Sequence, residues 1–318
     1  MKSLAKRILP APAWNRLRRT KSAAVGGFQS ALERAGYVVA ERDDYYSPLP
    51  PVSRLRATRE RWNRPSAMRG VSFDLDDMKR RLAVLLSRYQ DEFDGLPSNA
   101  QFRSEGFGPG LPAVDALTLY MMVRDRKPKR YVEVGAGLST YYCSLAARRN
   151  AMDGHPLEIV SIDPFPFERL RTMSEITLLE DEVQDVDISV FERLEADDIL
   201  FIDSTHILKI DGDVPFLYLE VLPLLNVGVM VHVHDVPFPF NVPFPAEFWT
   251  LDRQWPVFWN EAMLLQAFLC LNERFRIELS LPLLRHFDEA FLRAQIRCYE
   301  SVAENPDTFS SLWMRRVT

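Results

Sequence analysis

The sequence is poor in cysteine and contains no long apolar run. Its 318 residues include three cysteines, Cys143, Cys270 and Cys298, which lie far apart in the chain. Such spacing makes neither a disulfide framework nor a zinc ligand set, so a reducing cytoplasm is the expected location. No apolar run approaches the roughly 20 residues that cross a bilayer. We therefore expect no transmembrane segment.

An excess of positive charge is also missing. The 39 lysines and arginines are outnumbered by 44 acidic residues, which gives a net charge of -5. No overall basic field attracts nucleic acid, so we expect no nucleic-acid partner. What remains is 47% hydrophobic and 26% charged. This is the composition of a soluble globular protein, with enough chain for one large domain or two smaller ones.

The first 35 residues differ from the rest, because no acid precedes Glu33. Seven basic residues precede Glu33: Lys2, Lys6, Arg7, Arg16, Arg18, Arg19 and Lys21. Two interpretations stay open: an amphipathic segment that contacts an anionic membrane or a partner, and a solvated extension. We divide the chain into this basic extension (1–35), a helical and irregular cap region (36–125) and an α/β domain (126–318).

From residue 129 onward, apolar strand patterns alternate with helical ones. Strands are expected within 130–137, 157–163, 176–184, 198–206, 227–235, 274–280 and 310–317. Helices are expected at 73–95, 112–126, 138–150, 166–173, 189–196, 214–225, 258–273 and 291–302. Alternation of this kind predicts a Rossmann-like, doubly wound sheet of seven mostly parallel strands with helices on both faces. The inner strands are almost wholly apolar, as expected when both faces are covered.

The end of the first strand carries the sequence EVGAGLST, residues 133–140. Its glycines allow a tight turn and a close approach to a ligand, but Thr140 replaces the third glycine of the dinucleotide fingerprint. Asp163 ends the next strand, where a carboxylate can accept both hydroxyls of a ribose. A pyrophosphate cofactor gains little from the extra acid Glu133, whereas a cofactor with a cationic amino-acid tail tolerates it. The pattern favours S-adenosylmethionine over NAD.

These residues carry a family resemblance. The segments RYVEVGAGLST, VSIDP, DILFIDSTH and GVMVHVHD, followed by WNEAMLLQAFL, together resemble class I S-adenosylmethionine-dependent methyltransferases. Within that class they are similar to a bacterial subgroup found among sugar, polysaccharide and natural-product genes. The resemblance spans roughly residues 40–280. It implies that residues 126–318 are a cofactor-binding methyltransferase domain, and that the reaction is O-methylation of a small-molecule or glycan hydroxyl.

The resemblance also implies a set of cofactor-contacting residues at three strand ends: Glu133, Gly135, Gly137, Ser139, Thr140, Asp163, Pro164, Phe165 and Asp203. The acid and the glycines after the first strand would face the methionine part of the cofactor. Asp163 would hold the ribose, and the two residues that follow it would flank the adenine. Asp203 would lie beside the sulfonium, at the border with the methyl acceptor.

Four residues near two strand ends are candidates for catalysis: Asp203, His206, His234 and Asp235. Methyl transfer to a hydroxyl needs an in-line geometry and a route for the hydroxyl proton. In a metal-free site, His206 or His234 would be the base and a carboxylate would orient it. In a metal site, Asp203, His206 and Asp235 would bind a divalent ion. Val236 stands where some relatives have a second acid, so histidine ligands would suit a softer ion than magnesium.

Strand alternation places His232 and His234 on one face of the strand and Asp235 on the other. His232 lies deeper, so we expect it to be structural. The loop 237–249 follows, and its aromatic residues could pack on the core or line an acceptor pocket: Phe238, Phe240, Phe244 and Trp249. Glu261, after this loop, is a candidate for a further polar contact. Two other functions stay open, a non-catalytic binding protein of this fold and an NAD-dependent oxidoreductase.

Overall fold

The computed structural model describes residues 25–37, 45–108, 110–300, 304 and 309–318. The chain forms two compact units, residues 1–58 and 59–318. In the first unit, the described residues include a helix at 25–34 and helix α3 (Val52–Ala57). The basic residues of the first 24 positions lie outside the described residues, so the membrane-contact hypothesis stays a prediction. The domain boundaries at residues 35 and 125 also stay predictions.

The second unit is built on a seven-stranded sheet with the strand order β3-β2-β1-β4-β5-β7-β6. The strands are β1 (Arg130–Val134), β2 (Glu158–Ile162), β3 (Thr177–Leu179), β4 (Ile199–Ile202), β5 (Met230–Val233), β6 (Phe275–Ser280) and β7 (Leu312–Arg316). The first five run parallel, and β7 runs antiparallel between β5 and β6. The prediction of a mostly parallel, Rossmann-like sheet is confirmed.

The order of the strands determines where a ligand binds. The chain moves from β1 to β2 in one direction across the sheet and returns to β4 on the other side of β1. Right-handed crossovers in opposite directions place their helices on opposite faces of the sheet. The gap between the carboxyl ends of β1 and β4 is then the topological switch point, where ligands bind in sheets of this kind.

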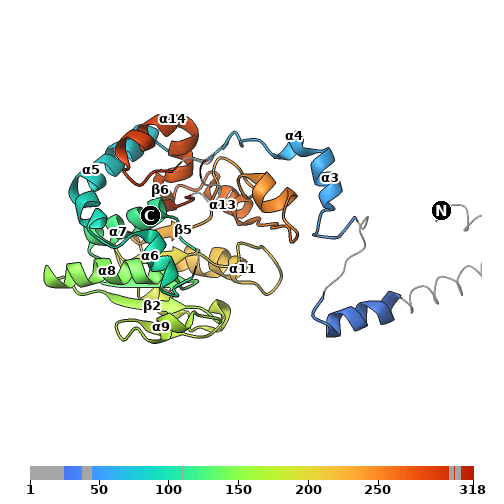
Figure 1. Cartoon of the computed structure of the whole chain (residues 1–318), viewed down its shortest axis with the longest axis horizontal. Coiled ribbons are helices and arrows are strands. Elements are labelled where there is room, and N and C mark those ends of the chain that lie inside the picture. Colours follow the sequence, from blue (N-terminus) through green and yellow to red (C-terminus); the bar gives the residue numbers. More distant parts are fainter. Residues whose placement is uncertain (1–24, 38–44, 109, 301–303, 305–308) are drawn as a thin grey trace, which may run out of the picture. The chain divides into compact units, whose positions relative to one another are not determined.

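The longer helices of the second unit pack around the sheet (Figure 1). They are α5 (Leu75–Asp94), α7 (Ala113–Arg126), α8 (Leu138–Met152), α13 (Glu261–Leu269) and α14 (Leu281–Gln295). Shorter ones are α4 (Arg59–Trp62), α6 (Asn99–Ser104), η1 (Val183–Asp185), α9 (Glu168–Arg171), α10 (Ser189–Glu192), α11 (Asp213–Phe216), η2 (Leu217–Val221), α12 (Leu222–Leu224) and η3 (Glu247–Leu251). Helix α7 packs against both α5 and α8. Almost all of α7 is buried, so it is a core helix between α5 and α8.

One helix prediction was wrong in its position. The sequence predicted a helix at 291–302, but α14 begins ten residues earlier and ends at Gln295. The side chain of Ser280 accepts a hydrogen bond from the backbone N–H of Leu283, and Pro282 lies in the first turn. A serine followed by a proline is a helix-start signal that was missed. Among the described residues, no helix has the length and apolar character to cross a membrane.

Candidate active site

The turn after β1 holds two strand ends together. Gly135 has a φ of 88°, and a Cβ atom placed there would lie 1.9 Å from the carbonyl oxygen of Asp203. The N–H of Asp203 donates to the carbonyl of Val134 at 2.9 Å, which completes the contact between the ends of β1 and β4. Only glycine combines this dihedral angle with so close an approach of two backbones. Gly137 follows, and its N–H donates to the hydroxyl of Thr140 at 3.1 Å as α8 begins.

Glu133 supports the glycine turn through buried hydrogen bonds. Its side chain is 0% exposed and accepts hydrogen bonds from the hydroxyls of Thr140, Ser161 (3.0 Å) and Tyr131 (3.2 Å). Burial raises the pKa of Glu133 to about 7, although these hydroxyl donors oppose the shift. Ser139 and Thr140 are buried as well. The carboxylate expected to face the cofactor is thus directed to protein hydroxyls, and it does not line the neighbouring cavity.

Replacing Glu133 with glutamine is expected to stabilise the protein above pH 7. The pKa of Glu133 rises from 4.5 in a free side chain to about 7 in the folded protein, so folding favours the protonated form. Protonation of Glu133 contributes fully to the free energy of unfolding below pH 4.5, and this contribution is lost as the pH rises to about 7. Glutamine stays neutral, so its advantage over the wild type should grow across this window, to at most about 3 kcal/mol. Urea unfolding of both proteins between pH 5 and 8 measures this difference, and a constant difference would contradict it.

A cavity of about 340 Å³ opens beside the glycine turn, at the carboxyl ends of β1, β2 and β4. Asp163 and Pro164 line it, as the sequence predicted. The two carboxylate oxygens of Asp163 accept the backbone N–H groups of Ala136 (2.9 Å) and Phe165 (2.7 Å), which fixes the side chain at the rim. The charged residues of the lining are five acids and one lysine: Asp163, Glu182, Asp203, Asp211, Asp213 and Lys209. The cavity therefore favours a positively charged ligand.

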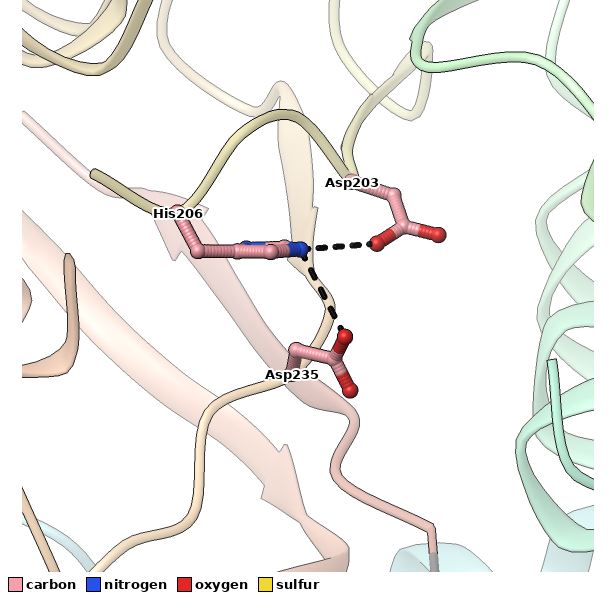
Figure 2. Close-up of side chains that lie close together, drawn as sticks. All are labelled: Asp203, His206 and Asp235. Carbon is pink, nitrogen blue, oxygen red and sulfur yellow. Dashed lines mark ion pairs between the residues drawn. The ribbon is translucent and has the colours of Figure 1, made fainter. Parts of the chain in front are cut away.

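Beside this cavity, three predicted residues converge on one point (Figure 2). The Nε2 atom of His206 lies 3.3 Å from Oδ1 of Asp203 and 3.4 Å from Oδ2 of Asp235. The opposite ring nitrogen, Nδ1, lies 2.8 Å from Oε2 of Glu261. His206 is 5% exposed, whereas the side chains of Asp203 and Asp235 are 24% and 26% exposed, so the imidazole is shielded and the two carboxylates reach the solvent. The sequence predicted Asp203, His206 and Asp235 as candidate residues, and the structure brings them together.

The second candidate histidine lies in the same network. Nδ1 of His234 is 3.2 Å from Oδ1 of Asp203, and Nε2 is 3.2 Å from Oδ2 of Asp115. Asp115 is fully buried on α7 and also accepts the backbone N–H groups of Ser310 and Ser311 at 3.0 Å. Sequence reasoning missed Asp115. Its signal is a single acid within the apolar stretch AVDALTLYMMV.

The charges of this network determine its protonation. Burial alone would lower the pKa of His206, but Asp203, Glu261 and Asp235 more than offset burial and raise it to about 10. The pKa of His234 is raised well above its usual value, because Asp203, Asp235 and Asp115 outweigh burial. Burial would raise the pKa of Asp203, yet the two histidines hold it below its usual range. Burial raises the pKa of Asp235. Without another cation, both imidazoles are therefore protonated near neutral pH, unlike the neutral imidazole of a general base.

His232 has a different environment, and its predicted structural role is confirmed. Its Nε2 atom lies 2.8 Å from the hydroxyl of Ser311, and its ring stacks on Trp313 with 3.9 Å between centroids. Burial and the charge of His234 lower its pKa well below the usual value. His232, which lies on β5, is therefore a neutral residue that packs against Ser311 and Trp313.

Asp235 lines a separate, narrow hollow of about 20 Å³, which has room for about one water molecule. Aromatic rings and one arginine contribute to its lining: Phe244, Trp249, Trp259, Phe309 and Arg285. Of the loop residues that the sequence singled out, Phe244 and Trp249 line the hollow, whereas Phe238 is buried. Phe240 stacks on Phe244 with 4.4 Å between centroids. Phe238 thus packs on the core, whereas the role of the loop in acceptor binding stays a prediction.

Comparisons with known proteins give one domain match and several similar chains. Residues 132–236 match the model of a methyltransferase domain, and the resemblance to class I methyltransferases is confirmed. An uncharacterized protein of Archaeoglobus fulgidus is 27% identical over an alignment of 165 residues. The match covers 48% of this chain and 72% of that protein.

Two solved structures are similar at lower identity. The O-methyltransferase TomG of Streptomyces achromogenes, in complex with SAM, is 16% identical with a TM-score of 0.42. The match covers 78% of this chain and 92% of TomG. An O-methyltransferase of Bacillus cereus in complex with SAH is 13% identical with a TM-score of 0.43, and the match covers 74% and 100% of the two chains.

Proposed function

We propose, on the premise that residues 132–236 carry a methyltransferase domain, that the chain transfers a methyl group from S-adenosylmethionine to a hydroxyl group. One observation carries the proposal. Asp203 lines the acidic cavity and Asp235 lines the aromatic hollow, while His206 contacts both carboxylates. The cluster thus lies between the cavity proposed for the methyl donor and the aromatic side chains proposed to receive the acceptor, which is the arrangement that an in-line displacement requires.

The charge of the cavity supports S-adenosylmethionine as the donor. This cofactor carries a positive sulfonium and a positive ammonium group, which five carboxylates attract. The pyrophosphate of NAD would be repelled by the same residues, so the oxidoreductase alternative is disfavoured. In this proposal Gly135 and Gly137 let the cofactor approach the backbone, and Asp163 and Pro164 hold its adenosine. Buried residues beneath the turn maintain its shape without touching the cofactor: Glu133, Ser139 and Thr140.

The aromatic lining of the hollow beside Asp235 favours an acceptor that contains a ring, which would bind once these side chains move apart from the 20 Å³ that they enclose. Aromatic side chains stack on flat rings and on the apolar faces of sugars. Trp249 and Trp259, whose ring centroids are 5.4 Å apart, form such a wall. The acceptor is then a small molecule or a glycan with a hydroxyl directed at Asp235.

We assign the catalytic roles to the buried cluster as a unit. Asp235 is the carboxylate on the acceptor side, where it would receive the hydroxyl proton. Asp203 is on the donor side, next to the expected position of the sulfonium. His206 contacts both carboxylates and fixes their positions relative to each other. His234, held by Asp115, fixes the orientation of Asp203.

Replacing Asp163 with alanine is expected to weaken the binding of S-adenosylmethionine about 10- to 100-fold, because one charged hydrogen-bonding partner is lost. Calorimetric titration of S-adenosylmethionine and S-adenosylhomocysteine measures the change. Glu168→Ala is the control, since Glu168 is exposed and does not line the cavity. If the wild-type protein binds neither compound, the proposed function is lost. Binding without turnover of any hydroxyl acceptor would instead favour a non-catalytic binding protein.

A further inference from the structure

We propose that Asp203, His206 and Asp235 bind one divalent transition-metal ion, and that Glu261 positions the histidine ligand. The proposal rests on the proposed function, which it extends by a metal cofactor. The three side chains come from two different strand ends, the loop after β4 and the residue after β5. Each offers one ligand atom, and these atoms lie within 4.8 Å of one another.

The distances in the cluster fit a metal ion. Zinc-like ions bind nitrogen and oxygen at about 2.0–2.2 Å, which places neighbouring ligand atoms about 3.0–3.5 Å apart. Nε2 of His206 is 3.3 Å from the Asp203 oxygen and 3.4 Å from the Asp235 oxygen. Both distances exceed the 2.8 Å between Nδ1 and Glu261. The two distances from Nε2 are therefore those of atoms that share one ion, and all three ligand atoms lie within 4.8 Å of one another.

Three consecutive residues at the start of α13 fix His206 in this position. The ring of Trp259 packs against the imidazole with 4.5 Å between centroids. The backbone N–H of Asn260 donates to the carbonyl of His206 at 3.0 Å, and the side chain of Asn260 accepts the N–H of Leu208 at 2.6 Å. Glu261 accepts the Nδ1 proton. The WNE segment thus holds the backbone, the ring face and one ring nitrogen of His206.

Glu261 also determines which nitrogen faces the carboxylates. Its second oxygen accepts the hydroxyl of Tyr218 at 3.0 Å, and both residues are buried. With Nδ1 protonated toward Glu261, the Nε2 lone pair points between Asp203 and Asp235. A lone pair facing two carboxylates is unfavourable unless a cation lies between them, and that cation is either a proton or a metal ion. Metal-binding histidines usually donate their other N–H to a carboxylate in this manner.

The kinds of ligand atoms indicate the kind of ion. Magnesium prefers oxygen ligands alone, whereas one imidazole with two carboxylates suits Mn²⁺, Fe²⁺, Co²⁺ or Zn²⁺. His234 donates from the far side to the same oxygen of Asp203, so this carboxylate is oriented by a second residue. An ion here would add positive charge between the two pockets, where it would favour loss of the acceptor's hydroxyl proton.

The test titrates chelator-treated protein with Mn²⁺, Co²⁺ and Zn²⁺, and with Mg²⁺ for comparison, by calorimetry, and follows bound Mn²⁺ by electron paramagnetic resonance. We expect one ion per chain, bound at least about tenfold more tightly than Mg²⁺. Glu261→Gln should weaken binding about 10- to 100-fold, because the orientation of the imidazole is lost. Glu273→Gln is the matched control, since Glu273 is exposed beyond the end of α13. Circular dichroism verifies that each variant is folded.

Two results would overturn the proposal. The first is a folded, chelator-treated protein that takes up none of the three ions, and the second is a Glu261→Gln variant that binds them like the wild type. Should Glu261→Gln fail to fold, His206→Asn provides the same comparison. The proposed function is tested separately. If S-adenosylmethionine binds and methyl transfer continues in chelator, the metal site is refuted and the methyltransferase stands; if the cofactor does not bind, the methyltransferase proposal fails whatever the metal titration shows.

Discussion

Replacing Gly135 with alanine is expected to destabilise the protein by about 2–5 kcal/mol and to abolish cofactor binding. The left-handed backbone angle accounts for about 1–2 kcal/mol of this loss. The added Cβ would also lie 1.9 Å from the carbonyl oxygen and 2.9 Å from the carbonyl carbon of Asp203. Both atoms belong to the backbone, so the ends of β1 and β4 must separate, which adds about 1–3 kcal/mol. Urea unfolding and calorimetry with S-adenosylmethionine measure the two effects.

Gly154→Ala is the matched control for this experiment. Gly154 has a φ of 85°, close to the 88° of Gly135, but a Cβ atom there meets nothing within 4 Å. The control should therefore lose only the backbone contribution and keep full cofactor binding. Equal losses of stability in the two variants would show that the strand ends are not in contact.

Replacing Asp203 with asparagine is expected to lower kcat/KM at least about 100-fold. Asp203 is the one member of the cluster that lines the acidic cavity, and its carboxylate also contacts His206 and His234. Asparagine keeps the shape but removes the charge that two cationic rings require. Release of S-adenosylhomocysteine, with the best acceptor found among phenols, catechols and glycans, measures the change.

Asp76→Asn is the control for the Asp203 variant, because Asp76 is an exposed acid in the first turn of α5, outside both pockets. Urea unfolding shows whether the Asp203 variant is folded. A folded variant that retains more than about a tenth of the wild-type kcat/KM would exclude Asp203 from the chemistry.

The sequence predicted the sheet and the strand-end residues because both depend on local patterns. An apolar run that ends in a glycine or an acid predicts both a strand and the position of its carboxyl end. Asp163, Asp203 and Asp235 could be named for this reason, and so could His206, which follows Asp203 by three residues in the loop after β4.

The partners of these residues could not be predicted in the same manner. Asp115 lies on a helix that begins more than a hundred positions before His234, and only the packing of α7 brings them together. Glu133 was expected to face the cofactor, but the hydroxyls of residues 131, 140 and 161 draw it beneath the turn. Such contacts depend on tertiary packing, which periodicity along the chain does not encode.

The position of β7 has a consequence for how the protein is made. This strand is the last in sequence order, yet it lies between β5 and β6 and pairs with both. Until the ribosome has released residues 312–316, β5 exposes an unpaired edge and β6 lacks its partner strand, and both are prone to aggregation. Ser310 and Ser311 hold Asp115, and through it His234, so the buried network is also incomplete until then. The candidate active site is therefore completed only after the last strand has been translated, and nascent chains that stall before residue 310 are expected to need chaperone protection.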